Sequence, residues 1–300
     1  MRIVGIGEIL YDVFPDCERL GGAPFNFAAH ASLLGHEVLF LSAVGEDERG
    51  RRALREAQEL GLSTEFIRTV PGAATGIVSV EVDPAGQPSF TIHRPAAYDQ
   101  LSLSAQDLDQ IAGFQPDWVC FGTLHQFHPP AKALTSFVLE ACPSARRFYD
   151  INLRRDSYRD PLVEELMLMA DVVKLNDAEA AEVSRMFGVP CDSISQFLRY
   201  WAARSGWSAA CVTLGEKGCA VLANDDFVEV PGYSVRVRDT VGAGDAFAAA
   251  FLHGLSLGWP AAEIADFSNR VGALVASRPG AVPAWTLEEC SGLRRTGSLQ

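Results

Sequence analysis

The fold is decided by residues 147–175, which read RFYDINLRRDSYRDPLVEELMLMADVVKL. Short apolar runs at 147–151 and 172–175 predict strands, and the stretch 162–169 between them predicts a helix. A strand, a helix and a strand in this order are typical of parallel neighbours in one sheet, with the helix covering one face.

The alternation continues in both directions along the chain. Further strands are expected at residues 2–7, 37–44, 118–121 and 209–214, and further helices at 25–34, 49–60, 105–112, 131–141, 178–187 and 194–204. The pattern predicts an α/β protein with a mostly parallel sheet flanked by helices on both faces. Ligands of such sheets usually bind beyond the carboxyl ends of the strands.

Two segments break the alternation. Residues 9–14, and the pair 76–82 and 88–94 joined by a turn at 83–87, have the composition of exposed strands and a hairpin. We expect a small β-sheet lid, formed by about residues 9–20 and 72–99.

The carboxyl-terminal part contains one more hairpin signal. Residues 219–223 and 227–230 flank the turn Asn224-Asp225-Asp226. We expect one domain of residues 1–290, into which the lid segments are inserted, followed by a polar tail of residues 291–300.

Composition restricts the possible partners. A chain of 300 residues, 48% hydrophobic and 21% charged, can bury a large core. Its net charge of −13 gives no long-range attraction to nucleic acid or to an anionic membrane, so neither is expected as a partner. The seven cysteines lack a C-x-x-C pair, which indicates reduced thiols, and no signal peptide or membrane-length apolar run is recognised. These features predict a cytoplasmic protein.

The strongest local signal is a glycine-rich helix start, Asp239-Thr240-Val241-Gly242-Ala243-Gly244-Asp245-Ala246-Phe247. The first amides of a helix have no intrahelical acceptor, so the N–H groups of Gly242, Ala243 and Gly244 are expected to hold the charge of a transferring phosphoryl group. Asp245 would accept the proton of an attacking hydroxyl as general base. The alternative is that Asp245 only caps the helix.

Four ordered elements resemble the PfkB (ribokinase-like) family of carbohydrate kinases, over about residues 1–285. The glycine-rich segment resembles its carboxyl-terminal signature, and Gly21-Gly22-Ala23-Pro24-Phe25-Asn26-Phe27-Ala28 resembles its amino-terminal sugar-binding motif. Asn176-Asp177-Ala178-Glu179 resembles its N-x-x-E element, and Thr213-Leu214-Gly215 with Gly218 resembles its nucleotide loop. The resemblance implies a ribokinase-like fold and a sugar kinase that uses ATP and Mg²⁺.

The resemblance implies a role for each matching residue. The acceptor hydroxyls would bind Asp12, Gly22 and Asn26, while Asp245 is the base. The alternatives are that Asp12 is an edge-strand charge and that Asn26 is a helix cap. The nucleotide would contact Asn176, Thr213, Gly215, Gly218 and Asn269, and Glu179 would position Mg²⁺ through water, unless it lies on a solvated helix face.

Some family members bind a monovalent cation beside the anion hole. The matching positions are Asp239, Val241, Val275, Arg278, Gly280 and Ala284. The last departs from the family pattern, because alanine has no hydroxyl. Activation by K⁺ is therefore a hypothesis.

The opening Gly7-Glu8-Ile9-Leu10-Tyr11-Asp12 and the run Asp150-Ile151-Asn152-Leu153-Arg154 resemble the fructokinase side of the family. Arg154 and, from the lid, Arg94 are candidate substrate contacts, with a surface ion pair and an edge-strand position as the respective alternatives. His93 stands where fructokinase-like chains often have an aromatic residue, which leaves the acceptor open.

Several functions compete with a fructokinase. The acceptor is expected to be fructose or a related ketose, and the alternatives are a nucleoside, a 2-keto-3-deoxy sugar acid, or a sugar-sensing protein without catalysis. An NAD-linked dehydrogenase is disfavoured because Gly5-Ile6-Gly7 is not followed by a third glycine. Exposed lid strands also suggest a homodimer formed through the lids.

Overall fold

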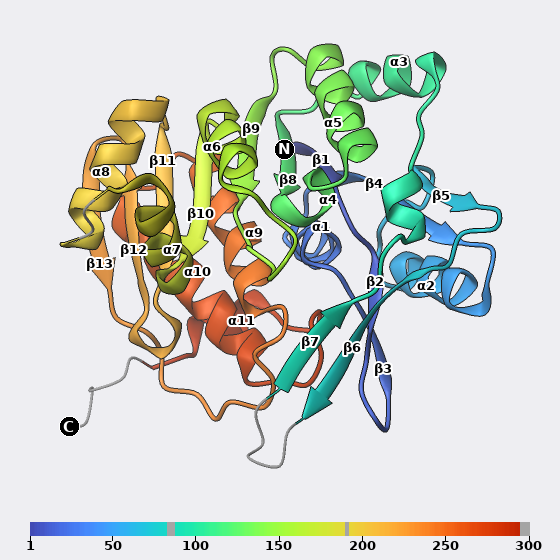
Figure 1. Cartoon of the computed structure of the whole chain (residues 1–300). Coiled ribbons are helices and arrows are strands. Elements are labelled where there is room, and N and C mark those ends of the chain that lie inside the picture. Colours follow the sequence, from blue (N-terminus) through green and yellow to red (C-terminus); the bar gives the residue numbers. More distant parts are fainter. Residues whose placement is uncertain (83–87, 190–191, 295–300) are drawn as a thin grey trace.

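The computed structural model describes residues 1–82, 88–189 and 192–294 (Figure 1). Among these residues two sheets are present, one of nine strands and one of four. The expected turn at 83–87 and most of the expected tail, 295–300, lie outside the described residues.

The large sheet has the strand order β13-β12-β11-β10-β9-β8-β1-β4-β5. Its strands are, in this order, Asp226–Val230, Cys219–Ala223, Ala209–Thr213, Val172–Asn176, Arg146–Asp150, Trp118–Gly122, Arg2–Ile6, Glu37–Gly45 and Ile67–Val70. Neighbours from β11 to β5 pair in parallel, and β12 and β13 add an antiparallel hairpin at one edge. The predicted parallel sheet and the carboxyl-terminal hairpin are confirmed, while β5 was not predicted.

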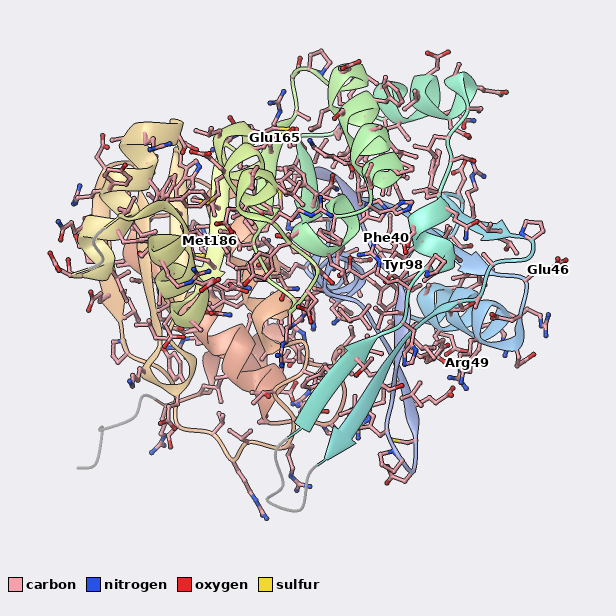
Figure 2. All side chains as sticks on the ribbon, viewed as in Figure 1. Phe40, Glu46, Arg49, Tyr98, Glu165 and Met186 are labelled. Carbon is pink, nitrogen blue, oxygen red and sulfur yellow. The ribbon has the colours of Figure 1, made fainter. Side chains whose placement is uncertain are left out.

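The small sheet has the order β3-β2-β6-β7 and projects from one side of the large sheet (Figure 1). Its strands are Glu18–Gly21, Leu10–Val13, Gly76–Val82 and Pro88–Ile92. β2 pairs with β6 in parallel, whereas β2 with β3 and β6 with β7 are antiparallel. Tyr98 is fully buried at the base of this sheet (Figure 2), where a Cβ at Gly76 would lie 2.6 Å from its ring.

Helices cover both faces of the large sheet (Figure 1). They are α1 (Ala23–Leu33), α2 (Glu48–Glu59), α3 (Ala105–Gly113), α4 (Thr123–Gln126), α5 (Pro129–Ala141), α6 (Asp160–Met169), α7 (Asp177–Phe187), α8 (Ile194–Ser205), α9 (Ala243–Ser256), α10 (Ala261–Ala276) and α11 (Leu287–Ser291). α11 was not predicted, and it ends inside the segment expected to be a tail.

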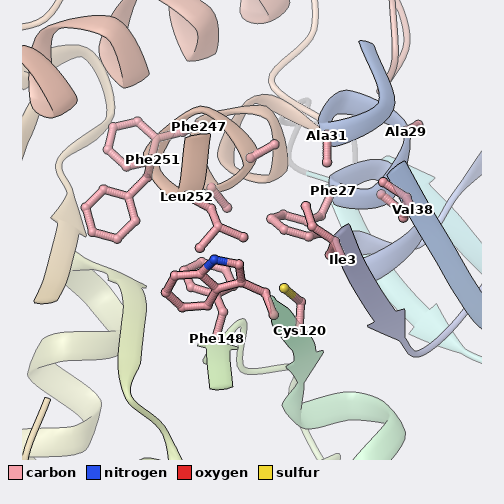
Figure 3. Packing of buried hydrophobic residues seen from close by; sticks show 14 of the residues in the cluster. Ile3, Phe27, Ala29, Ala31, Val38, Cys120, Phe148, Phe247, Phe251 and Leu252 are labelled. Atoms are coloured by element: carbon pink, nitrogen blue, oxygen red, sulfur yellow. The ribbon is translucent and has the colours of Figure 1, made fainter. Parts of the chain in front are cut away.

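Two hydrophobic cores lie on opposite faces of the large sheet. Successive strand residues alternate between them: Phe148 packs with α1, α2, α9 and α10, while Tyr149 packs with α3, α5, α6, α7 and α8. On the first face Phe27 of α1 stacks on Phe148 with ring centroids 5.6 Å apart (Figure 3). Burial on both faces explains why the strands read as nearly continuous apolar runs. No helix among the described residues is long and apolar enough to cross a membrane.

Candidate active site

The candidate site forms where the carboxyl ends of β1, β9 and β10 meet the amino end of α9. Parallel strands end at the same edge of a sheet, so the residues that follow them are brought together despite their distance in the sequence. This edge carries Glu8, Asp150, Lys174 and, from α9, Asp245.

The start of α9 depends on Gly242. Its φ is 79°, and a Cβ there would lie 2.2 Å from the carbonyl oxygen of Ala281, so no other residue fits without a shift. The ring of His30, in α1, forms a hydrogen bond with that same carbonyl, with Nε2 3.0 Å from the oxygen. Burial lowers the pKa of His30 to about 4, so the ring is neutral at pH 7 and donates Nε2–H.

The amide groups of this turn are partly free. The N–H of Ala243 donates a long hydrogen bond of 3.3 Å to Thr240, whereas no described residue accepts a hydrogen bond from the N–H of Gly242, Gly244 or Asp245. Free amides at a helix start favour an anion. The free amide donors at this turn are therefore those of Gly242, Gly244 and Asp245, while that of Ala243 is already engaged.

Asp245 lies in the first turn of α9 and contacts the predicted sugar-binding motif. Its Oδ2 accepts a hydrogen bond of 2.8 Å from Nδ2 of Asn26, a residue of α1. Burial raises the pKa of Asp245, and Lys174 and the Asn26 hydrogen bond oppose that rise. The side-chain oxygen of Asn26 is buried without a partner among the described residues, so it can accept a hydrogen bond from a ligand.

Lys174 and Asp150 form a buried ion pair that was not predicted. Nζ of Lys174 lies 3.0 Å from both carboxylate oxygens of Asp150, and the two side chains are 7% and 14% exposed. A Cβ at Gly244 would lie 3.4 Å from the same Nζ, so the ammonium borders the start of α9. Burial alone would lower the pKa of Lys174, but Asp150, Glu179 and Asp245 raise it above its usual value.

A sequence signal for this pair existed. Lys174 is the charged residue of a buried apolar strand, and in the ladder it stands directly beside Asp150 at the end of the neighbouring strand. Opposite charges at matching positions of two consecutive parallel strands indicate a pair.

Asp12 and Gly22 lie on the small-sheet side of the site. Burial raises the pKa of Asp12 to about 6, with Arg154 opposing the rise. Gly22 has a φ of 110°, and a Cβ there would lie 2.4 Å from the carbonyl oxygen of Glu8, so this close approach requires glycine.

The two candidate arginines differ. Arg154 is exposed, its guanidinium makes no hydrogen bond or ion pair with a described residue, and its charge lowers the pKa of Glu8, Asp12, Asp150 and Asp245. Arg94 is instead ion-paired to Asp99 and donates to the carbonyl of Leu124 at 3.2 Å. Arg154 is thus available to a ligand, while Arg94 has partners within the chain.

Asn176 and Glu179 form the start of α7. Oδ1 of Asn176 accepts from the N–H of Glu179 at 2.8 Å, and Oε2 of Glu179 accepts from the N–H of Asn176 at 2.8 Å. The other Glu179 oxygen accepts from the N–H of Leu153 at 2.9 Å. Glu179 is buried, so it does not lie on a solvated helix face.

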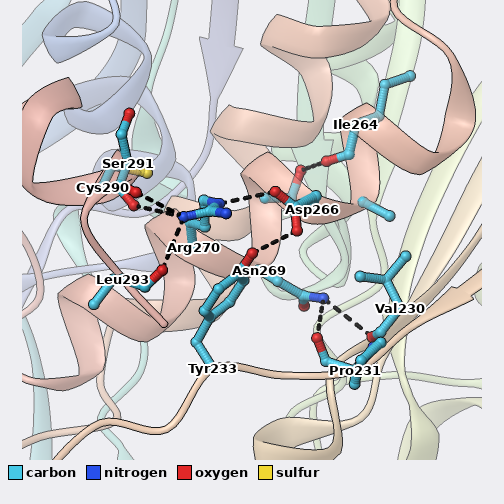
Figure 4. A network of polar contacts seen from close by, with 12 residues as sticks. Val230, Pro231, Tyr233, Ile264, Asp266, Asn269, Arg270, Cys290, Ser291 and Leu293 are labelled. Atoms are coloured by element: carbon cyan, nitrogen blue, oxygen red, sulfur yellow. Dashed lines mark hydrogen bonds and ion pairs between the residues drawn. The ribbon is translucent and has the colours of Figure 1, made fainter. Parts of the chain in front are cut away.

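The other residues predicted to bind the nucleotide lie on or next to β11, β12 and α10. Thr213 ends β11, and Gly215 begins the 3₁₀ turn Gly215–Lys217. A Cβ at Gly218 would lie 2.0 Å from the carbonyl oxygen of Val230. Asn269 of α10 donates to that same carbonyl at 3.2 Å (Figure 4), so its side chain joins α10 to the end of β13.

The predicted cation positions gather around Asp239. Its carboxylate accepts from the N–H of Val241 at 3.0 Å and from that of Gly280 at 3.1 Å, and it is ion-paired to Arg19 of β3. Arg278 pairs with Glu289 and donates its own N–H to the carbonyl of Val275 at 3.0 Å. Within the described ranges no three His, Cys, Asp or Glu residues are grouped so as to hold a metal ion by themselves.

The fold and this strand-end site define a ribokinase-like kinase of small molecules. A family model described as pfkB family carbohydrate kinase matches residues 8–287. The chain therefore belongs to the pfkB family of carbohydrate kinases, and it is a sugar kinase.

Individual relatives agree with the family match. A fructokinase of Vibrio alginolyticus is 30% identical over 296 residues, which cover 93% of this chain and 94% of that protein. The solved structure of a sugar kinase of Pyrococcus horikoshii, PH1459, in complex with ATP has a TM-score of 0.79 and 29% identity, with 93% of each chain covered. The solved structure of 2-dehydro-3-deoxygluconokinase from Thermotoga maritima has a TM-score of 0.84 over 98% of each chain, but at 19% identity it shows the fold alone.

Proposed function

We propose that this sugar kinase transfers the γ-phosphoryl group of ATP to a hydroxyl of fructose or of a related ketose. The observation that carries the proposal is the contact between Asn26 and Asp245 at the start of α9. It joins the predicted acceptor motif to the predicted base, within reach of the free amides of Gly242 and Gly244. The fructokinase relative supports a ketose as acceptor.

Each residue of the site has a task in the proposed reaction. Asp12 and Asn26 orient the acceptor, and Asp245 takes the proton of the attacking hydroxyl as the new P–O bond forms and the bond to ADP breaks. The free N–H groups at the start of α9 stabilise the charge on the phosphoryl oxygens. Lys174 favours the ionised form of Asp245, because its ammonium opposes the rise in the pKa of that carboxyl.

The nucleotide is proposed to bind over β11 and α10, at Asn176, Thr213, Gly215, Gly218 and Asn269. Mg²⁺, when bound, would neutralise charge on the triphosphate. Each oxygen of Glu179 accepts one backbone hydrogen bond and keeps further lone pairs, which fits a residue that orients water around the ion. We also propose that K⁺ activates the enzyme by binding among the residues around Asp239. Equal rates in sodium, potassium and a bulky organic cation would contradict this proposal.

A 2-keto-3-deoxy sugar acid is the second candidate acceptor. The exposed, unpaired guanidinium of Arg154 favours it, because such a group can bind a carboxylate bidentately.

The exposed Phe90 of β7 supports a dimer through the small sheets, and a monomeric mass in light scattering would remove that proposal.

The test is an ADP-release assay with Mg-ATP across ketoses, aldoses, 2-keto-3-deoxy acids and nucleosides. Turnover of a ketose that the Asp245→Asn variant loses supports the main proposal. Turnover of the acid alone selects the second candidate. A shift in melting temperature without any turnover would instead identify a sugar-sensing protein.

A further inference from the structure

Glu8 is a buried carboxyl at the strand-end edge for which the proposed reaction has no task. It follows β1 directly, and the preceding residue is held in place because the carbonyl of Gly7 accepts a hydrogen bond of 2.6 Å from Ser42. The backbone carbonyl of Glu8 is the group that Gly22 approaches. The position of Glu8 is therefore tied to the predicted acceptor motif.

The side chain of Glu8 is buried, and its hydrogen bonding is incomplete. It is only 4% exposed, and its Oε2 has no hydrogen-bond partner among the described residues. A buried polar atom without a partner is costly, so such atoms are usually satisfied by a bound molecule or water.

Glu8 also lines a pocket at the carboxyl ends of β1, β8 and β9. The other polar lining residues are Thr123, Asp150 and Asn152, and the remaining wall is mainly apolar, with Phe27 and Phe148 among its side chains. The enclosed space is about 20 Å³, enough for about one water-sized group. The pocket can therefore admit a single hydroxyl group and no carbon skeleton.

The charges around Glu8 suit a hydrogen bond to a hydroxyl. Burial raises the pKa of Glu8 to about 7, opposed by Arg154 and Arg94 and assisted by Asp245. The hydroxyl of Tyr98 is likewise buried without a partner in the part of the chain that the structure describes, and Glu8 raises its pKa, so the two lie within electrostatic reach. Near neutral pH a carboxyl with this pKa can both donate to and accept from a sugar hydroxyl.

We propose that Glu8 is a specificity-determining residue, whose carboxyl binds a hydroxyl of the acceptor other than the one that is phosphorylated. This inference rests on the proposed function and refines it. It places one hydroxyl of the acceptor at the pocket between β1, β8 and β9.

The test compares Glu8→Met, which keeps the length of the side chain, with Glu8→Gln, which keeps its hydrogen bonding. For Glu8→Met we expect the KM of the acceptor to rise about tenfold or more while the KM of ATP is unchanged. Glu8→Gln should stay within about threefold of the wild type, since an amide can still pair with a hydroxyl. Glu46→Gln, at an exposed glutamate (Figure 2), is the matched control.

A series of deoxy analogues provides the second measurement. The wild type should bind one deoxy analogue more weakly than the acceptor itself. Glu8→Met should bind that analogue and the acceptor about equally, because the variant already lacks the hydrogen bond that the analogue cannot make. An unchanged acceptor KM in a folded Glu8→Met variant would overturn the proposal. So would equal losses for every analogue in both proteins, and Glu8→Ala takes the place of Glu8→Met in this comparison if Glu8→Met does not fold. If the proposed function is wrong, the wild type itself shows no turnover, which separates that failure from failure of the role of Glu8. The affinity of each variant for the sugar is then measured by the shift in melting temperature instead of by KM.

Discussion

Two parts of the site, the start of α9 and the small sheet, are held in place by different kinds of interaction. At the start of α9, Gly242 is pressed against the backbone of Ala281, and Lys174 is buried against Asp150. The small sheet reaches the same loop through the ion pair of Arg19 with Asp239, in which Arg19 is 41% exposed. Close-packed backbone and buried charge tolerate little change, whereas an exposed ion pair contributes little stability. The start of α9, which carries the proposed base, is therefore fixed more firmly than the small sheet.

Replacing Asp245 is expected to have the largest effect. Asp245→Asn removes the proposed base but keeps its size and its contact with Asn26, so kcat should fall by about 10² or more while the sugar still shifts the melting temperature. Kinetics and thermal shift measure the two properties separately. Asp109→Asn, on an exposed position of α3, is the control. Near-normal turnover would contradict the assignment of Asp245 as base.

Gly242→Ala tests whether the backbone at the start of α9 is as rigid as the contacts suggest. The added Cβ would meet the carbonyl of Ala281 at 2.2 Å, so the loop must shift and its free amides move away from the phosphoryl group. We expect a loss of kcat of about 10² and a lower melting temperature. Gly113→Ala, where a Cβ meets nothing within 4 Å, should change neither. Unchanged kinetics would show that the loop adapts.

Lys174→Met tests the buried charge. Without the ammonium the pKa of Asp245 rises further, so the acid limb of the kcat profile should move to higher pH, because a base works only when it is ionised. Each unit by which that pKa exceeds the assay pH costs about tenfold in rate. The double variant Lys174→Met with Asp150→Asn avoids an unpaired buried carboxylate and should show a smaller displacement, because Asp150 and Asp245 each raise the pKa of the other. Lys132→Met, which loses a partly exposed pair with Glu165, should leave the profile in place.

Arg19→Gln should have the smallest effect. Losing a partly exposed pair is expected to lower the free energy of unfolding by less than about 1 kcal/mol. The KM of the acceptor should rise about threefold with kcat nearly unchanged, because β3 would be less firmly held over the site. Arg51→Gln, at an exposed pair with Glu48, is the control in denaturant unfolding and kinetics. A large fall in kcat would show that the small sheet takes part in the chemistry itself.

The sequence predicted the elements that depend on neighbouring residues. The parallel sheet, both hairpins and the helices before residue 205 other than the short α4 follow from local periodicity, and Gly242 and Asp245 lie within one short motif. The strands β3 and β5 have four residues each and were missed, although the equally short β2 was predicted. Such short strands form through their partners and carry little pattern of their own.

Contacts between distant residues were harder to predict. Lys174 was overlooked because its position beside Asp150 appears only when the register of β9 and β10 is known, and the Arg19 pair with Asp239 spans 220 positions. The contact of Arg94 with the acceptor stays a prediction, and its ion pair with Asp99, five residues later, was not foreseen. The turn that brings Asp99 back to the guanidinium depends on the tertiary path of the chain, which residue pattern does not specify.

The helix α1 carries Asn26, which holds Asp245, and one turn later His30, which holds the carbonyl behind Gly242. A single rigid segment thus sets both the acceptor amide and the phosphate-binding loop, so a displacement of α1 would misalign both at once. During divergence within the family, changes in this helix would alter selectivity and turnover together. Substitutions in β2, β3, β6 and β7 escape that constraint, and we expect new acceptor preferences to arise there first.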